Sequence, residues 1–383
     1  MRSHSLSSHY PDTNNQHLFA TEASGHMTNS HCGHLARSLL IAGSVLACRP
    51  AESAPPFLRV DATDVVSLQL TPIGRISLAT HADSTPEQIS QVVRVSDTYW
   101  VLDTRKRRIE LFDHAGKRSA SIQASDVDTA GLIDPRRFAI ARDTLFVLDG
   151  AYLDRIAKFD QTGRALAYQR IRNSDVLTDI VVRNGTTYAA TALSSANTGQ
   201  GMVRQFQNQT EERTISGCPR DPRFVESRDK GGILKVFSFV TLSVLGDKLY
   251  CAQRITPVVE SMSLDGTPAG QVAFAPPFYV APQDRKMTTN IRTLNAYAAT
   301  WTALQQFHPL RAGFVQVYAV FDSVAGTQRH RLFACDTSGV RLRCGESMSP
   351  GRPVYFGAPD TLIVHVTDST SGRAQLALYR LAF

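Results

Sequence analysis

Two pairs of Asp and Arg recur at matching places in the chain and could support charged chemistry. Asp103 is followed by Arg108, and Asp149 is followed by Arg155. A carboxylate beside a guanidinium occurs both in active sites and in structural ion pairs. Because a catalytic group is needed only once, its repetition favours the structural role, in which the Asp accepts hydrogen bonds from the Arg and ties the loop between two strands. We therefore assign no catalytic residue here.

A basic run separates the two members of the first pair. Arg105, Lys106 and Arg107 stand together in the expected loop between two strands. These side chains could bind the phosphate or uronate groups of an anionic partner, or they could form a solvated charged loop. The sequence leaves both interpretations open.

The histidines show no metal-binding spacing. Six of the eleven precede Cys48, and the other five, His81, His114, His308, His330 and His365, lie at unlike positions. The chain has no His-Glu-x-x-His motif, no Gly-x-Ser-x-Gly elbow and no P-loop. We therefore predict no metal and no cofactor.

The N-terminal region is typical of an exported protein. Residues 1–26 are polar, Met27 is a plausible start, and Ser38–Ala47 form a short apolar core. The ending Val45-Leu46-Ala47-Cys48 resembles the lipobox of bacterial lipoproteins, which implies a lipid on Cys48 and a location in the outer membrane or periplasm. An ordinary signal peptide with an incidental cysteine is the alternative. We expect an upstream extension and signal over 1–47 and a Pro-rich tether over 48–63.

Four cysteines follow Cys48, an even number that suits an oxidising compartment. Cys335 and Cys344 flank an expected hairpin, where neighbouring strands bring cysteines within disulfide reach. This predicts the pair Cys335–Cys344 and leaves Cys218–Cys251. Four buried free thiols are the alternative.

A recurring unit of short strands underlies the chain. Five times a tight turn leads into an apolar run, beginning at Thr98, Thr144, Thr186, Lys248 and Thr361. The equivalent Gly116 and Gly163 are 47 residues apart. Units of about 40–50 residues with several strands each are typical of a β-propeller. We predict an all-β fold, a six-bladed β-propeller over residues 64–383. The last unit lacks a strand, which we expect Val65–Leu70 to supply, closing the ring.

Two units carry a further likeness. The stretches Val101–Lys117 and Val147–Gly163 share an apolar pair, Asp, a polar loop, Arg-Ile, an aromatic residue, Asp and Gly. This pattern resembles the NHL repeat, and the whole chain resembles the six-bladed propeller lipoproteins of bacterial envelopes. The resemblance implies a fold more than an activity.

Two long segments interrupt the repeat and are the expected ligand-binding loops. Cys218–Gly232 is rich in Pro and Gly, and Asp284–Leu310 is either an insertion with a short helix or a long loop followed by an inner strand. We predict a monomeric, non-catalytic binding or scaffolding propeller, held to the membrane by its lipid alone. Its partner would be an unknown envelope protein or glycan, and not nucleic acid. The alternative is a metal-dependent hydrolase, similar to lactonases or phosphotriesterases, or a lyase, with its site in the central channel.

Overall fold

The computed structural model divides the chain into two units, Met1–Ser53 and Ala54–Phe383. All residues that it describes belong to the second unit. They are 57–78, 86–123, 132–150, 155–171, 177–191, 203–207, 210–215, 223, 226–227, 230–237, 239–286, 288, 290–322, 327–338, 342–357 and 360–382.

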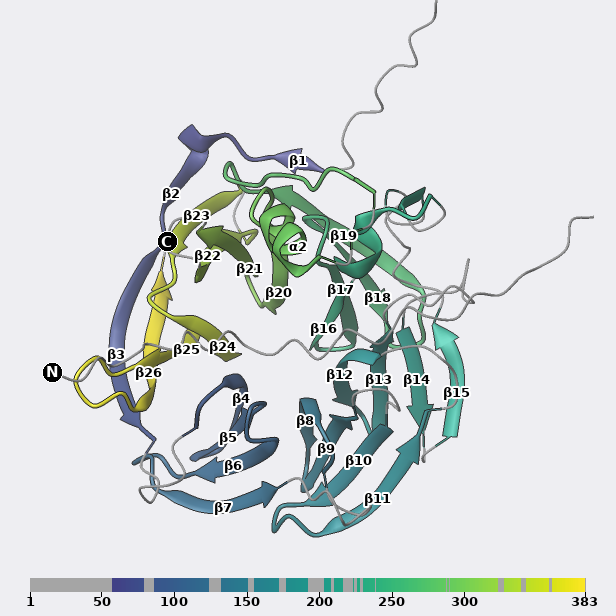
Figure 1. Cartoon of the computed structure of the whole chain (residues 1–383), viewed down its shortest axis with the longest axis vertical. Coiled ribbons are helices and arrows are strands. Elements are labelled where there is room, and N and C mark those ends of the chain that lie inside the picture. The colour runs from purple at the N-terminus through teal and green to yellow at the C-terminus, as the bar shows by residue number, and fades with distance from the viewer. Residues whose placement is uncertain are drawn as a thin grey trace, which may run out of the picture. The chain divides into compact units, whose positions relative to one another are not determined.

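Six small sheets form a ring, as predicted (Figure 1). We number them as blades 1 to 6 along the chain. Blade 1 holds β4 (Ile89–Val95), β5 (Thr98–Asp103), β6 (Arg108–Phe112) and β7 (Arg118–Gln123). Blade 2 holds β8 (Pro135–Ala141), β9 (Thr144–Asp149), β10 (Arg155–Asp160) and β11 (Ala165–Arg170). Blade 3 holds β12 (Leu177–Arg183), β13 (Thr186–Thr191), β14 (Val203–Gln207) and β15 (Thr210–Ile215).

The second half of the ring incorporates strands from the N-terminal side of the unit. Blade 4 holds β16 (Val240–Leu245), β17 (Lys248–Gln253), β18 (Val258–Ser263), β19 (Pro268–Ala275) and β1 (Leu58–Arg59). Blade 5 holds β20 (Ala303–Leu310), β21 (Gly313–Asp322), β22 (Thr327–Asp336), β23 (Arg343–Met348) and β2 (Val65–Ser67). Blade 6 holds β24 (Arg352–Gly357), β25 (Thr361–Thr367), β26 (Ala374–Ala382) and β3 (Gln69–Ser77).

Turn chemistry explains why the second strand of each unit begins where the sequence predicts. In blades 1 to 4 a two-residue turn joins the first two strands, and its first residue has a positive φ, at Ser96, Arg142, Asn184 and Gly246. Such turns match the twist of the strands that they join. The outer turns of blades 1 and 2 use Asp113 and Asp160, whose carboxylates accept backbone N–H groups of the turn.

The ring closes through an N-terminal strand, as expected, but most of that strand lies further along the chain than the sequence indicated. We expected Val65–Leu70, of which only Gln69 and Leu70 pair antiparallel with β26; the closing strand is β3, Gln69–Ser77. The apolar Val65–Ser67 segment instead forms β2, which pairs in parallel with β23 of blade 5. Strand pairing also begins before residue 64, because Leu58–Arg59 pairs in parallel with β19 of blade 4. One segment therefore covers the outer edges of three successive blades.

Apolar contacts between neighbouring blades hold the ring together. Among the described residues six buried clusters lie at the six blade interfaces. Between blades 1 and 2, for example, Trp100 and Leu102 pack with Phe138 and Phe159. A seventh cluster, described below, belongs to no blade interface.

Candidate functional site

Polar side chains on the inner strands tie one blade to the next. Five of the six inner strands contain a β-bulge near their first residue. Just after the bulge, Gln91 bonds the backbone N–H and C=O of Phe138 at 2.9 and 2.8 Å. Asp179 accepts from Leu242 N at 2.9 Å, and Gln306 donates to Pro353 O at 3.3 Å. Each of these contacts reaches the inner strand of the following blade, so these groups are structural.

The two Asp–Arg pairs differ in the structure. Asp149 is fully buried and accepts from Arg155 at 2.8 Å (Nε) and 2.6 Å (a terminal nitrogen), and from the backbone N–H of Asp134 at 2.6 Å. Asp103 accepts four backbone N–H groups, two of them from its own loop. Arg108 lies opposite Asp103 in register, but its ion pair within the described residues is with Glu110, at 3.2 Å.

The basic run is already engaged in local contacts. Arg105 and Lys106 share the Glu87 carboxylate, at 2.9 and 3.4 Å. Arg107 donates to the Ile133 carbonyl at 3.2 Å. The Glu87 carboxylate thus offsets part of the positive charge of Arg105 and Lys106, which weakens their electrostatic attraction for an external anion.

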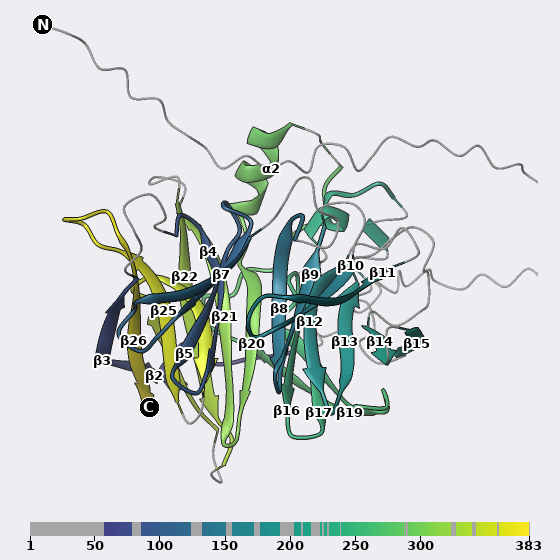
Figure 2. The same ribbon diagram turned by 90° about the horizontal axis from the view of Figure 1, so that it is seen from below.

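The two long segments meet at one end of the ring. Ile89 pairs with Asp103, so the start of an inner strand and the loop after the second strand share one end of a blade. The long segments precede inner strands β16 and β20 and therefore lie at that same end, where α2 (Ile291–Ala298) projects beyond the sheets (Figure 2). We call the described residues of 226–237 and 283–302 the cap. The cap contains both a helix and the approach to an inner strand, so the two alternatives for Asp284–Leu310 each hold in part.

The cap has an apolar core of its own. Ile233 and Leu234 from the first segment pack with Tyr297 and Trp301 from the second, and Ile255 of blade 4 lies beneath them. Phe237 contacts both aromatic rings, with centroids 5.6 and 5.5 Å apart. The Tyr297 hydroxyl donates to the Gln283 carbonyl at 2.9 Å, and burial raises the pKa of Tyr297 to about 12.

A polar joint fastens the two cap segments. The Asp284 carboxylate accepts from the Ser227 hydroxyl at 2.8 Å, and Ile233 N donates to Arg285 O at 2.7 Å. Gly232 lies so close to this joint that a Cβ there would be 2.2 Å from an Asp284 oxygen. Glycine is therefore required for the close approach of the two segments.

The outer surface of the cap is basic. Arg285, Lys286 and Arg292 are exposed and have no carboxylate within 4.0 Å among the described residues. Lys230 pairs with Glu226. The cap therefore presents uncompensated positive charge to solvent, which attracts anionic partners.

The histidines do not converge. His114 is exposed on a turn, His308, His330 and His365 lie on three different strands, and His81 is outside the described residues. No group of three or more His, Cys, Asp or Glu in the described part of the chain could hold a metal ion. The metal-dependent alternative therefore has no ligand set among these residues.

The sequence analysis missed three arginines at the cap end of the channel. Arg137 lies on β8, Arg352 begins β24, and Arg254 directly follows β17. Arg254 and Arg352 are half-buried, and burial together with the neighbouring arginine charges lowers the pKa of each to about 10. Their separation along the chain, about a hundred residues from one to the next, gives no local motif. Two of them stand near the start of an inner strand and Arg254 directly follows a second strand, and these positions share one end of the blade.

Cys335 and Cys344 form a disulfide, as predicted. They face each other on β22 and β23 with Cα atoms 4.1 Å apart. Cys251 is also disulfide-bonded. Its predicted partner Cys218 and the predicted lipidation site Cys48 lie outside the described residues.

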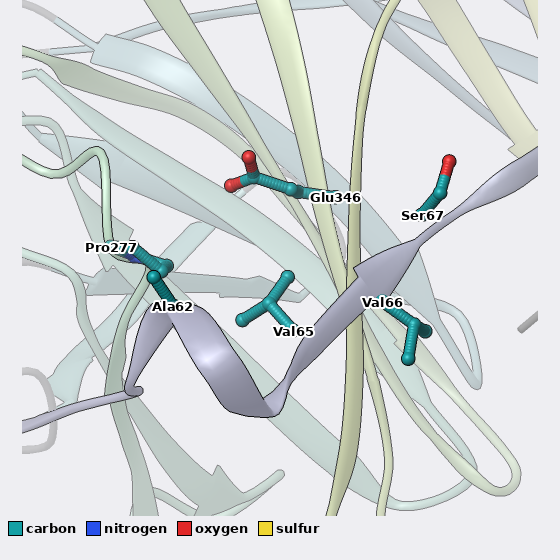
Figure 3. A pocket seen from close by; sticks show the side chains of 6 residues that line it. All are labelled: Ala62, Val65, Val66, Ser67, Pro277 and Glu346. Atoms are coloured by element: carbon teal, nitrogen blue, oxygen red, sulfur yellow. The ribbon is translucent and has the colours of Figure 1, made fainter.

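A shallow hollow of about 330 Å³ lies on the outer wall, between the N-terminal segment and blades 4 and 5 (Figure 3). Ala62, Val65, Val66, Ser67, Pro277 and Glu346 line it. Its one carboxylate, Glu346, bonds Arg331 at 2.6 Å. The residues that line it come from outer strands and the segments beside them, not from the channel.

Comparison with known proteins supports the fold. No protein-family model matches the sequence, and no curated protein matches it. A DUF4221 family member from Bacteroides vulgatus superposes with a TM-score of 0.59 at 9% identity, covering 82% of this chain and 98% of that one. A Bacteroides fragilis protein, described as inferred to be exported, gives a TM-score of 0.59 at 9% identity, covering 85% and 97%. At this identity the likeness shows the six-bladed propeller alone.

Proposed function

We propose that this protein is a non-catalytic binding propeller of the bacterial envelope that recognises an anionic protein or glycan through its cap end. One observation carries the proposal. The cap joins two segments that lie outside the blade strands through an apolar cluster that belongs to no blade interface. Ordering such segments costs conformational entropy of about 1–2 kcal/mol per residue. Ordered loops of this kind commonly carry binding residues, and we therefore assign ligand binding to the cap.

Charge indicates the class of partner. Among the described residues, Arg285, Lys286 and Arg292 of the cap have no carboxylate within 4.0 Å, whereas Arg105 and Lys106 at the same end share Glu87. Long-range attraction between a basic face and an acidic partner raises the association rate and weakens as salt rises. We therefore assign the main electrostatic contribution to the cap, with Arg105–Arg107 as a flanking patch.

The proposed location follows from the N-terminal segment and is supported by one structural neighbour. The Val45–Cys48 ending predicts lipid attachment, and the Bacteroides fragilis neighbour is described as inferred to be exported. In the described residues no helix has the length and apolar character needed to cross a membrane. We propose that lipid on Cys48 tethers the ring and leaves the cap accessible to partners.

The function can be tested with two polyanionic probes, immobilised heparin and a polyglutamate peptide. The double variant Lys286→Ser/Arg292→Ser should weaken salt-sensitive retention of at least one probe. The matched control Arg183→Ser/Lys248→Ser alters the opposite end of the ring and should bind as wild type. Substituting Arg105–Arg107 by Ser should have an intermediate effect.

Two results would contradict the proposal. One is equal retention of wild type and the cap variant on both probes. The other is turnover of lactone or phosphoester substrates that a chelator abolishes and Ca²⁺ or Zn²⁺ restores, which would support the metal-dependent enzyme instead.

A further inference from the structure

We propose that Arg137, Arg254 and Arg352 form a binding site for a small tetrahedral dianion, a phosphate or sulfate group, at the cap end of the channel. The three residues belong to blades 2, 4 and 6, so they stand on alternate blades around the ring. The charge of Arg137 acts on both Arg254 and Arg352, although the three residues lie on three different blades. The site differs from the exposed surface of the cap and does not depend on the function proposed for that surface.

The three arginines stand near the same end of the ring. Arg352 is the first residue of its inner strand, and Arg137 is the third of its own. Arg254 N donates to the carbonyl of Phe239, the residue before β16, and Arg254 O accepts from Leu304 N of the next inner strand. The Arg254 guanidinium lies over the Phe239 ring, 4.8 Å from its centroid, which holds it beside the mouth of the channel.

Their positive charge lacks a matching set of carboxylates. Among the described residues no Asp or Glu lies within 4.0 Å of the guanidinium of Arg254 or Arg352. Arg137 approaches one carboxylate oxygen of Asp179 at 3.8 Å. That carboxylate already accepts from the backbone N–H groups of Ile180 and Leu242. Burial raises the pKa of Asp179, which weakens it further as a counter-charge. Among the described residues the three guanidinium groups therefore carry more positive charge than the carboxylate in contact with them can offset, and a dianion would supply the difference.

The pKa values of these arginines support the same conclusion. Burial lowers the pKa of Arg254 and Arg352 to about 10, and the charge of Arg137 contributes to both shifts. Half-buried like charges are costly unless a counter-charge is present. His365 lies opposite Arg352 in register, and burial together with the Arg352 charge lowers its pKa, so at neutral pH it is an uncharged imidazole beside the site.

The three guanidinium groups favour a tetrahedral anion as the ligand. Guanidinium groups match the oxygens of phosphate and sulfate in geometry and form strong charge-assisted hydrogen bonds with them. A tetrahedral anion can present one oxygen to each of three donors arranged around an axis. A monocarboxylate has two oxygens in one plane and satisfies fewer of them.

Isothermal titration of the whole mature chain with inorganic phosphate and with sodium sulfate tests the site. Acetate and chloride at matched ionic strength serve as controls. We expect saturable binding of both dianions, and a loss of about tenfold or more in affinity for Arg254→Gln and for Arg352→Gln, because each removes a charge-assisted contact. Arg183→Gln, at an exposed position on the opposite end of the ring, should bind as wild type.

The melting temperatures of the same variants distinguish a loss of binding from a loss of folding. Without ligand, Arg352→Gln should melt at or above the wild-type temperature, because it removes a desolvated and repelled charge. Failure of wild type to bind either dianion, an equal response to chloride, or unchanged binding by both channel variants would overturn the proposal. These outcomes leave the heparin and polyglutamate results untouched, so this site and the proposed function can fail separately.

Discussion

Two histidines, the half-buried His308 and the buried His330, should make the ring sensitive to acid. His308 stacks on Phe356 with centroids 4.2 Å apart, and burial lowers its pKa to about 3. His330 is 8% exposed, and burial together with the Arg352 charge lowers its pKa to about 4. Each ring meets a glutamine oxygen at 3.1 Å. Both histidines therefore stay neutral in the folded ring at pH values where an unfolded chain would protonate them.

The sign and size of the effect follow from linkage. Both pKa values are depressed below the unfolded value of 6.5, so the unfolded chain binds protons first as the pH falls. The stability that depends on neutral imidazoles is full above pH 6.5 and is lost as the pH falls from there toward pH 4 and 3. Between pH 7 and pH 5 each histidine lowers the free energy of unfolding by about 2 kcal/mol, and the two together lower it by about 4 kcal/mol.

Urea unfolding at pH 7 and pH 5 measures this effect. The wild-type chain should lose about 4 kcal/mol more over that interval than the double variant His308→Asn/His330→Asn, in which neither position titrates. The carboxylates are common to both proteins, so their contribution cancels in the difference. Equal pH dependence in the two proteins would refute the assignment of buried neutral histidines.

Three further outcomes test other parts of the account. Cys48→Ser should release the mature protein from membranes, and sedimentation of that variant with membranes after a salt wash would contradict the lipid anchor. A truncation beginning at Leu78 should lower the melting temperature far more than one beginning at Leu68, because only the first removes the closing strand β3; equal melting would refute closure by β3. Gly232→Ala should expose the cap to proteolysis while Gly74→Ala, whose Cβ meets nothing within 4 Å, should not; equal protection would show that the joint is unimportant.

Local turn chemistry made most of the fold predictable. The strands beginning at Thr98, Thr144, Thr186, Lys248 and Thr361 start where the sequence placed them, because each follows a tight turn. The closing strand was misplaced for a physical reason. β3 is an outer strand, largely exposed, with Pro72 and Gly74 in its middle, so it lacks the apolar alternation that identifies strands. We predicted the closing strand at the more apolar Val65–Ser67, which pairs with blade 5 instead.

The candidate sites depended on long-range contacts that no local pattern reports. The long loops were recognisable from their composition, but their joint core, with Leu234 packed beside Trp301, exists only because two connections share one end of the ring. Arg137, Arg254 and Arg352, which we propose form one site, belong to three different blades and are about a hundred residues apart from one to the next. The basic run Arg105–Arg107 is visible as a local pattern in the sequence. Its partners Glu87 and Ile133 are distant in the sequence, so the local pattern did not show that the run is already engaged.

Site-specific photo-crosslinking in cells tests most directly whether the cap end is the recognition face. A photoreactive side chain at Arg292 on α2 or at Arg105 would report on the cap end, and one at Arg183 or Lys248 on the opposite end; all four positions are exposed. The account predicts a defined cross-linked species from Arg292, also seen from Arg105, and none from Arg183 or Lys248. Cross-linking of the same species from the opposite end, or from neither end, would contradict it.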